Sequence, residues 1–111
     1  MSIEHIDVDE GRARVAAGAL LLDVREHDEW DAGHAPEAVH LVLGELPVRH
    51  TELPTDREIV VMCKAGGRSA MATEALVGAG YRAVNVAGGM LAWVEAGLPC
   101  VTDAGTPGMV A

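Results

Sequence analysis

One short segment of the sequence combines a cysteine, two glycines and two basic side chains. It runs Cys63, Lys64, Ala65, Gly66, Gly67, Arg68, Ser69. Glycine lets a chain bend tightly, so several backbone N–H groups can point at one anion. The nucleophilic form of cysteine is the thiolate, and such surroundings bring the thiol pKa from ~8.5 to roughly 3.5–7.5. We therefore expect Cys63 to be an activated nucleophile in an anion-binding loop, and not a buried structural cysteine.

The elements around this segment must hold the cysteine at the end of a strand. Residues 59–62 are an apolar, β-branched run with the length of a buried strand. Helical spacing then extends from Ser69 to Val77. The N-terminus of that helix would face the same point and add about half a positive charge. The sequence thus predicts a strand, a tight loop and a helix, with Cys63 at the carboxyl end of the strand.

The rest of the chain alternates predicted strands with predicted helices. The strands cover residues 5–8, 20–24, 39–42, 58–62 and 83–86. The first predicted helix has an apolar face of Ala13, Ala16, Ala17 and Leu20, and the last carries Met90, Trp93, Val94 and Gly97 at helical spacing. Between them lie a short acidic helix or turn at 26–33 and a helical turn at 43–48. This alternation predicts an α/β fold, with a parallel sheet that helices cover on both faces.

Parallel sheets carry their sites at the carboxyl ends of their strands. Asp23 and Arg25 come at the end of the second predicted strand, as Cys63 comes at the end of the fourth. We therefore expect these three side chains on one rim of the sheet.

Charge and composition exclude several classes of protein. The chain has 111 residues, of which 50% are hydrophobic, and a formal net charge of −9, with Lys64 as its single lysine. This balance argues against binding to nucleic acid or to an acidic membrane surface. No apolar run is long enough to cross a bilayer, and the N-terminus does not resemble a secretory signal. Since the two cysteines fit neither a disulfide scaffold nor a C-x-x-C motif, we expect a cytoplasmic protein.

The motifs of nucleotide and metal sites are missing. Neither G-x-x-x-x-G-K-[ST] nor G-x-G-x-x-G follows a predicted strand. The histidines are scattered without the spacing of metal ligands: His5, His27, His34, His40 and His50. Five carboxylates form one acidic cluster: Asp23, Glu26, Asp28, Glu29 and Asp31. Such a cluster could bind a divalent metal, but a solvated helix face is the better interpretation. We expect neither a metal nor a cofactor.

Three ordered blocks of the sequence resemble those of the single-domain rhodanese family. Residues 63–69 resemble its C-x-x-G-x-R-S loop, residues 22–36 its D-V-R-E-x-x-E-[FYW]-x-x-G-H-I-P segment, and residues 88–99 its closing G-G-x-x-A-W-x-x-A-G-x-P. The resemblance extends from about Ile6 to Pro99. The chain departs from the family at Glu37, where glycine is usual, and at Val42, where proline is frequent.

This resemblance implies a three-layer α/β/α fold with a five-stranded parallel sheet, and sulfur transfer through a persulfide on Cys63. The residues that would bind the anionic substrate are Lys64, Ala65, Gly66, Gly67, Arg68 and Ser69. The partners would be a small anionic sulfur donor such as thiosulfate and an acceptor that is cyanide, a thiol or another protein. Asp23 and Arg25 would support the loop; alternatively Asp23 caps the next helix and Arg25 forms a structural ion pair.

Several other residues have plain structural interpretations. His34 is expected to be a buried hydrogen-bonding residue and not a base, and Trp30 and Trp93 are expected in the core. Cys100 lies past the last predicted helix and is interpreted as a bystander, with a resolving thiol as the alternative. We expect one domain over residues 1–101 and a flexible tail over residues 102–111, which contain several glycines and a proline.

Three alternative functions remain open. A phosphatase or arsenate reductase on the same scaffold would use a C-x5-R loop, whereas Cys63 and Arg68 form the shorter C-x4-R. A sulfur-relay module would pass its sulfur to a protein partner. A non-catalytic interaction domain is the third, but such a domain would usually lack the cysteine.

Overall fold

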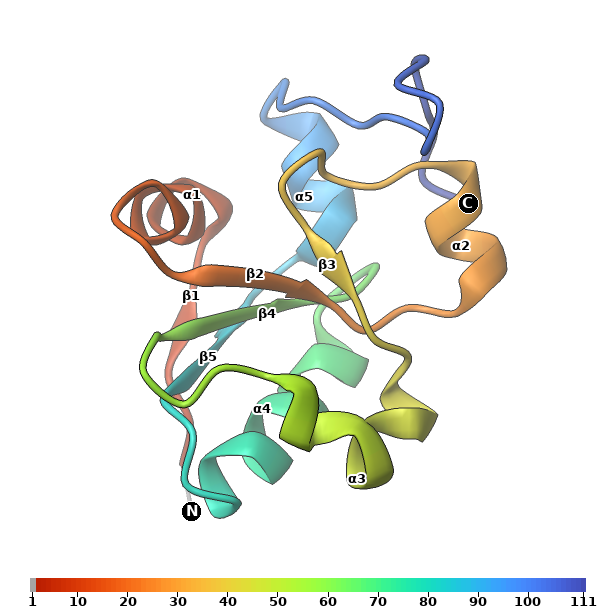
Figure 1. Cartoon of the computed structure of the whole chain (residues 1–111). Coiled ribbons are helices and arrows are strands. Elements are labelled where there is room, and N and C mark those ends of the chain that lie inside the picture. The colour runs from red at the N-terminus through yellow and green to blue at the C-terminus, as the bar shows by residue number, and fades with distance from the viewer. Residues whose placement is uncertain (1) are drawn as a thin grey trace.

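Five parallel strands form one sheet at the centre of the molecule (Figure 1). A computed structural model describes residues 2–111. The strands are β1 (His5–Ile6), β2 (Leu20–Asp23), β3 (Val39–His40), β4 (Ile59–Met62) and β5 (Ala83–Val86), in the order β1-β5-β4-β2-β3. All the pairings are parallel, so every strand ends at the same rim. The predicted α/β fold with a five-stranded parallel sheet is confirmed.

Helices cover both faces of this sheet and give the three layers (Figure 1). On one face lie α1 (Val8–Ala16) and α5 (Gly89–Glu95). On the other lie α4 (Gly67–Gly78) and α3 (Leu46–Arg49), the latter flanked by 3-10 turns at Leu43–Glu45 and His50–Glu52. The short helix α2 (His27–Ala32) lies beyond the carboxyl ends of β2 and β4. None of the helices within residues 2–111 is long and apolar enough to span a bilayer.

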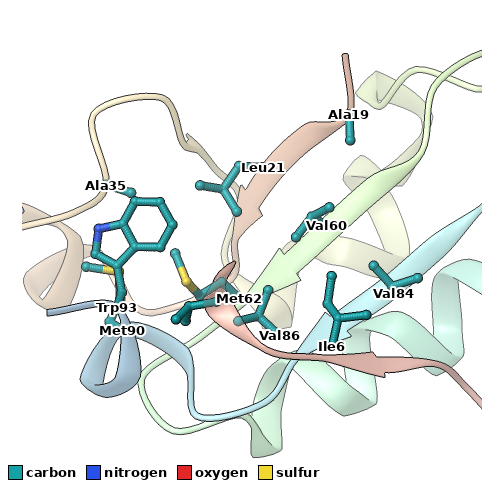
Figure 2. Close-up of a cluster of buried hydrophobic side chains, with 11 residues drawn as sticks. Ile6, Ala19, Leu21, Ala35, Val60, Met62, Val84, Val86, Met90 and Trp93 are labelled. Atoms are coloured by element: carbon teal, nitrogen blue, oxygen red, sulfur yellow. The ribbon is translucent and has the colours of Figure 1, made fainter. Parts of the chain in front are cut away.

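The alternation of side chains along β4 determines the face of the sheet to which Cys63 points. Val60 and Met62 belong to the core between the sheet and α1 and α5, where Met62 lies near Trp93 (Figure 2). Val61 and Cys63 belong to the opposite core, which α3 and α4 cover. Because successive side chains of a strand point to opposite faces, Cys63 continues the α4 side of the strand. The sulfur therefore lies on the same side of the sheet as the helix that follows it.

The predicted alanine face of the first helix is wrong. Val8 and Gly11 are the buried residues of α1. Of the predicted face, Ala13, Ala16 and Ala17 are exposed, and Leu20 opens β2. A Cβ at Gly11 would lie 3.3 Å from Cγ2 of Val86. The helix thus approaches the sheet closely along its glycine, and its alanines supply helix propensity in solvent.

Other predicted boundaries also move. The edge strands are shorter than the runs at 5–8 and 39–42, because α1 begins at Val8 and a 3-10 turn begins at Leu43. Helix α4 begins at Gly67, earlier than the predicted Ser69. The first turn of α4 is therefore built from the glycine-rich loop itself.

The C-terminal segment lies against the end of α2. His34 and Val101 exchange backbone hydrogen bonds of 2.8 and 2.9 Å, and the N–H of Met109 donates to the carbonyl of Ala32 at 3.0 Å. Gly33 lies so close to this segment that a Cβ on it would meet the backbone of Met109 at 2.6 Å. The flexibility of residues 102–111 and the single domain over residues 1–101 stay predictions.

Gly89 should tolerate substitution worse than an open glycine of the same backbone class. Gly89 has φ +51°, and a Cβ there would lie 2.7 Å from the carbonyl carbon of Lys64. Gly80 has φ +96° and no atom within 4 Å of such a Cβ. We expect Gly80→Ala to cost about 1–2 kcal/mol for left-handed backbone, and Gly89→Ala to cost a further ~1–3 kcal/mol for overlap with the active loop. Urea denaturation of both variants measures this difference, and equal losses would contradict it.

Candidate active site

Cys63 lies directly after β4, with its sulfur inside the loop that leads into α4. The residue is 1% exposed. Its Sγ accepts a hydrogen bond from the N–H of Gly66 at 3.1 Å and one from the hydroxyl of Ser69 at 3.4 Å. The loop thus folds back over the sulfur within a single turn. Ser69 lies in the first turn of α4. One turn further along, the hydroxyl of Thr73 donates to the backbone carbonyl of Ser69 at 2.7 Å.

Two carbonyl groups of the loop, those of Cys63 and Lys64, point toward α5. The N–H of Met90 donates to the carbonyl of Cys63 at 2.8 Å, and the N–H of Leu91 donates to the carbonyl of Lys64 at 3.1 Å. These are donors of the first turn of α5, which have no partner inside their own helix. Because the carbonyls are occupied outside the loop, its N–H groups are free to face inward. The pair of Gly88 and Gly89, both at positive φ, brings this helix end into place.

The surroundings of Cys63 favour the thiolate in spite of burial. Burial is the largest single influence and acts to raise the thiol pKa. The hydroxyl of Ser69 and the N–H groups of Ser69, Gly66 and Ala65 act in the opposite direction and together outweigh it. The pKa of Cys63 therefore lies below its ordinary value. A buried sulfur with inward N–H donors can attack an electrophile and hold the anion that forms.

Arg68 is held by a carboxylate of α2. Its two terminal nitrogens donate to Oε1 and Oε2 of Glu29 at 2.5 and 2.9 Å. The hydrogen bonds from Arg68 outweigh the effect of burial and lower the pKa of Glu29 to about 2, and the same contact raises the pKa of Arg68. Within residues 2–111, no carboxylate lies within 4 Å of the ammonium of Lys64. The net positive charge of the loop therefore rests on Lys64, while Arg68 is half of a neutral pair.

Asp23 and Arg25 lie on the predicted rim, and among residues 2–111 no hydrogen bond or ion pair joins their side chains to residues 63–69. Both are fully buried and form an ion pair of 2.8 Å. Arg25 also donates to the carbonyl of Gly33 at 2.8 Å and to that of Glu29 at 3.3 Å, so it holds the C-terminal end of α2. Glu26, and not Asp23, caps α2. The structural ion pair is thus the interpretation that the geometry supports, and Arg25 reaches the loop only through α2 and Glu29.

The other members of the acidic cluster divide into two groups. Glu26, Asp28 and Asp31 are exposed, as a solvated helix face predicts. Asp23 and Glu29 are not, because each is the partner of an arginine. In the part of the chain that the structure describes, no three His, Cys, Asp or Glu side chains converge as a metal site requires.

The aromatic predictions are right for Trp93 and wrong for Trp30. Trp93 is 2% exposed in the core. Trp30 is half-buried on the rim, where it stacks between His34 and His40 with ring centroids 3.6 and 4.7 Å away. Its indole N–H donates to Asp103 at 3.2 Å. An apolar ring with a polar edge suits this half-exposed position.

His34 and Cys100 both lie beside the C-terminal segment. His34 is buried, and its ring nitrogens lie 2.9 Å from the carbonyl of Ala35 and 2.8 Å from Asp103. The prediction of a buried hydrogen-bonding residue is confirmed. Cys100 is half-buried against Gly33, and burial raises its pKa. Cys100 has none of the donors that favour the thiolate of Cys63.

Two parts of the site escape the sequence prediction. The sequence pattern places Glu29 on a solvated face, and its position in the E-x-x-E-W part of the second block is the signal that distinguishes it. The N–H groups of Met90 and Leu91 carry no side-chain signal at all. Their one trace is the Gly88-Gly89 pair at the start of α5.

Known proteins resemble this chain over nearly its whole length. Residues 7–96 match the model of the Rhodanese-like domain. A sulfurtransferase of Allochromatium vinosum is 37% identical over 106 residues, which cover 93% of this chain and 99% of that protein. A putative sulfurtransferase of Bacillus subtilis, YtwF, is 42% identical over 84% of this chain and 92% of its own. The crystal structure of a rhodanese-related protein from Thermoplasma volcanium superposes with a TM-score of 0.84, at 32% identity, over 90% of this chain and 99% of that one.

The pair of Glu29 and Arg68 should make stability depend on pH in acid. The pKa of Glu29 falls from 4.5 to about 2 on folding, so its stabilisation is complete above pH 4.5 and is lost as the pH falls through 2. Glu29→Gln lacks it at every pH. Near pH 7, we expect the free energy of unfolding of the wild type to exceed that of Glu29→Gln by about 1–2 kcal/mol, because solvent screens part of the ion pair. Chemical denaturation from pH 7 to pH 2 should show this difference shrinking; a constant difference would contradict the assignment.

Proposed function

This chain belongs to the rhodanese-like domain family, and we propose that it transfers sulfane sulfur from a small anionic donor to a nucleophile through a persulfide on Cys63. The sulfurtransferases among its relatives support an enzyme of rhodanese type. The observation that carries the proposal is the sulfur of Cys63, which accepts from the N–H of Gly66 and the hydroxyl of Ser69 in a loop that favours the thiolate.

The reaction needs two displacements at sulfur. With thiosulfate as donor, the thiolate of Cys63 attacks the outer sulfur, a new S–S bond forms, and the old S–S bond breaks with its electron pair leaving on sulfite. The product is a persulfide anion on Cys63. Cyanide or a thiolate then attacks the terminal sulfur, the S–S bond to Cys63 breaks, and the thiolate returns. No proton or electron carrier is required, so the loop has only to hold anions.

The loop residues supply that support. The N–H groups of Ala65, Gly66 and Ser69 would hold the terminal sulfur of the persulfide as they favour the thiolate. Lys64 would attract the dianionic donor, because its ammonium is the cation of the loop without a carboxylate partner among residues 2–111. Arg68 would act more weakly on the donor, since Glu29 already occupies two of its nitrogens. Gly67 begins α4, and its backbone directs that helix end at the site.

Two further properties belong to the same proposal. We propose that the acceptor is cyanide, a small thiol or a thiol of a partner protein, because each can attack a terminal sulfur. We also propose a cytoplasmic location. Cys63 and Cys100 are both free, and a reducing compartment keeps a catalytic thiol in that state.

Cys63 should carry the transferred sulfur and Cys100 should not. Incubation with thiosulfate should add the mass of one sulfur atom to the intact protein, and a reductant should remove it. Cys63→Ala should gain no mass and have no thiosulfate:cyanide activity, because alanine forms no persulfide. Cys100→Ala should keep most of the activity, since Cys100 lacks the donors of the loop. Equal loss in both variants would require a resolving-thiol mechanism, and no mass gain with any sulfane donor would overturn the proposal.

The loop length should select sulfur over phosphate. Four residues separate Cys63 from Arg68, and the N–H groups of this short loop enclose a single sulfur. A tetrahedral phosphate or arsenate would crowd the backbone. We expect turnover of thiosulfate with cyanide and little hydrolysis of an aryl phosphate, measured by steady-state kinetics on both substrates. A preference for the aryl phosphate would favour a phosphatase.

A further inference from the structure

A buried amide occupies a strand position where an apolar residue is expected. Asn85 lies in β5, which pairs with β1 and β4, and it is 2% exposed. Its neighbours Val84 and Val86 face the core under α1 and α5, whereas Ala83 faces the core under α4. Asn85 therefore points to the α4 side of the sheet, the side on which Cys63 lies. Burying an amide costs free energy unless its hydrogen bonds are replaced, so its contacts should indicate its role.

The amide of Asn85 donates to the active loop. Its Nδ2 lies 3.3 Å from the carbonyl oxygen of Gly66 and 3.0 Å from Nδ1 of His5. The carbonyl of Gly66 also accepts the first helical hydrogen bond of α4, from Ala70 at 3.2 Å. If the amide were turned over, its Oδ1 would face the carbonyl oxygen of Gly66, so the loop fixes its orientation. Within residues 2–111, Oδ1 of Asn85 is the one buried side-chain oxygen or nitrogen without a partner.

Gly66 joins this contact to the reactive sulfur. Its N–H donates to Sγ of Cys63 at 3.1 Å, and its carbonyl accepts from Asn85 on the other side. Gly66 is in the left-handed region, with φ +110° and ψ −7°. Its surroundings leave little room, since a Cβ there would lie 3.2 Å from the backbone nitrogen of Gly88. Fixing the carbonyl of this one residue therefore limits the direction of its N–H.

Two other carbonyls of the loop are held by backbone groups. Those of Cys63 and Lys64 accept from N–H groups of α5, which no side-chain substitution removes. Of the hydrogen bonds within residues 2–111, the bond from Asn85 to Gly66 is the one in which a side chain donates to a carbonyl of residues 63–68. It is thus the one support of this kind that a point substitution can delete.

We infer that Asn85 is a positioning residue for Cys63: by holding the carbonyl of Gly66, it keeps the N–H of Gly66 aimed at the sulfur and favours the thiolate and the persulfide anion. The inference deepens the proposed sulfur transfer and rests on it for its catalytic consequence. The part that concerns the thiolate needs no sulfur donor and can be tested separately.

The test measures how fast iodoacetamide alkylates Cys63 as a function of pH, in a Cys100→Ala background so that one thiol reacts. Asn85→Leu keeps the approximate shape and removes the donor. We expect the midpoint of its alkylation profile to lie about one pH unit above that of the protein with Asn85. At a pH below both midpoints, Cys63 should then react roughly tenfold more slowly. In thiosulfate:cyanide kinetics at the same pH, the activity should fall by a similar factor and recover at high pH. If Asn85→Leu does not fold, Asn85→Ala also removes the donor and introduces neither bulk nor charge.

Tyr81→Phe is the matched control. The hydroxyl of Tyr81 donates to the backbone carbonyl of His50 at 2.7 Å, so the control also deletes one bond from a side chain to a carbonyl, but outside the loop. It should lower the melting temperature without moving the alkylation midpoint. An unchanged midpoint in a folded Asn85 variant, with only a lower melting temperature, would overturn the inference. A wild type that alkylates as expected but transfers no sulfur would refute the proposed function and leave the role of Asn85 standing.

Discussion

A chain can direct several N–H groups at one sulfur only if the carbonyls of the same stretch have partners elsewhere. Here N–H groups in the first turn of α5 donate to the carbonyls of Cys63 and Lys64, with hydrogen bonds of 2.8 and 3.1 Å. The close approach is possible because Gly89 has no Cβ. The active loop is therefore not a property of residues 63–69 alone. It is a joint product of the loop and of a helix that begins more than twenty residues later in the chain.

The electrostatics of the rim follow from a second long-range arrangement. The buried pair of Asp23 and Arg25 holds the end of α2, and α2 presents Glu29 to Arg68. Thus the charge of Arg25 is neutralised by Asp23 in the interior, and the charge of Arg68 is neutralised by Glu29 on the rim. In a chain with a net charge of −9, a single unpaired cation at the loop produces a local field of opposite sign. This cation would attract a small anion toward the cysteine.

Local patterns in the sequence were sufficient for the framework and insufficient for these supports. Short apolar runs predict all five strands, and the cysteine loop marks the strand end that carries the nucleophile. The alanine spacing of the first helix misleads, because the helix packs on the sheet along Gly11, where a Cβ would be in tight contact with Val86. Glu29 and Asn85 owe their roles to residues 39 and 19 positions away. No periodicity encodes such contacts, since they depend on which strands become neighbours.

The strand order also sets the time at which the site can exist during synthesis. β1 pairs with β5, in the register His5 to Asn85, so the first strand to leave the ribosome must wait for the last. Cys63 emerges well before β5 and α5, which hold its loop. A nascent chain that has released β1 to β4 therefore carries an ordinary thiol and two unpaired inner strand edges. The loop around Cys63 can therefore reach its final geometry only after β5 and α5 have joined the fold.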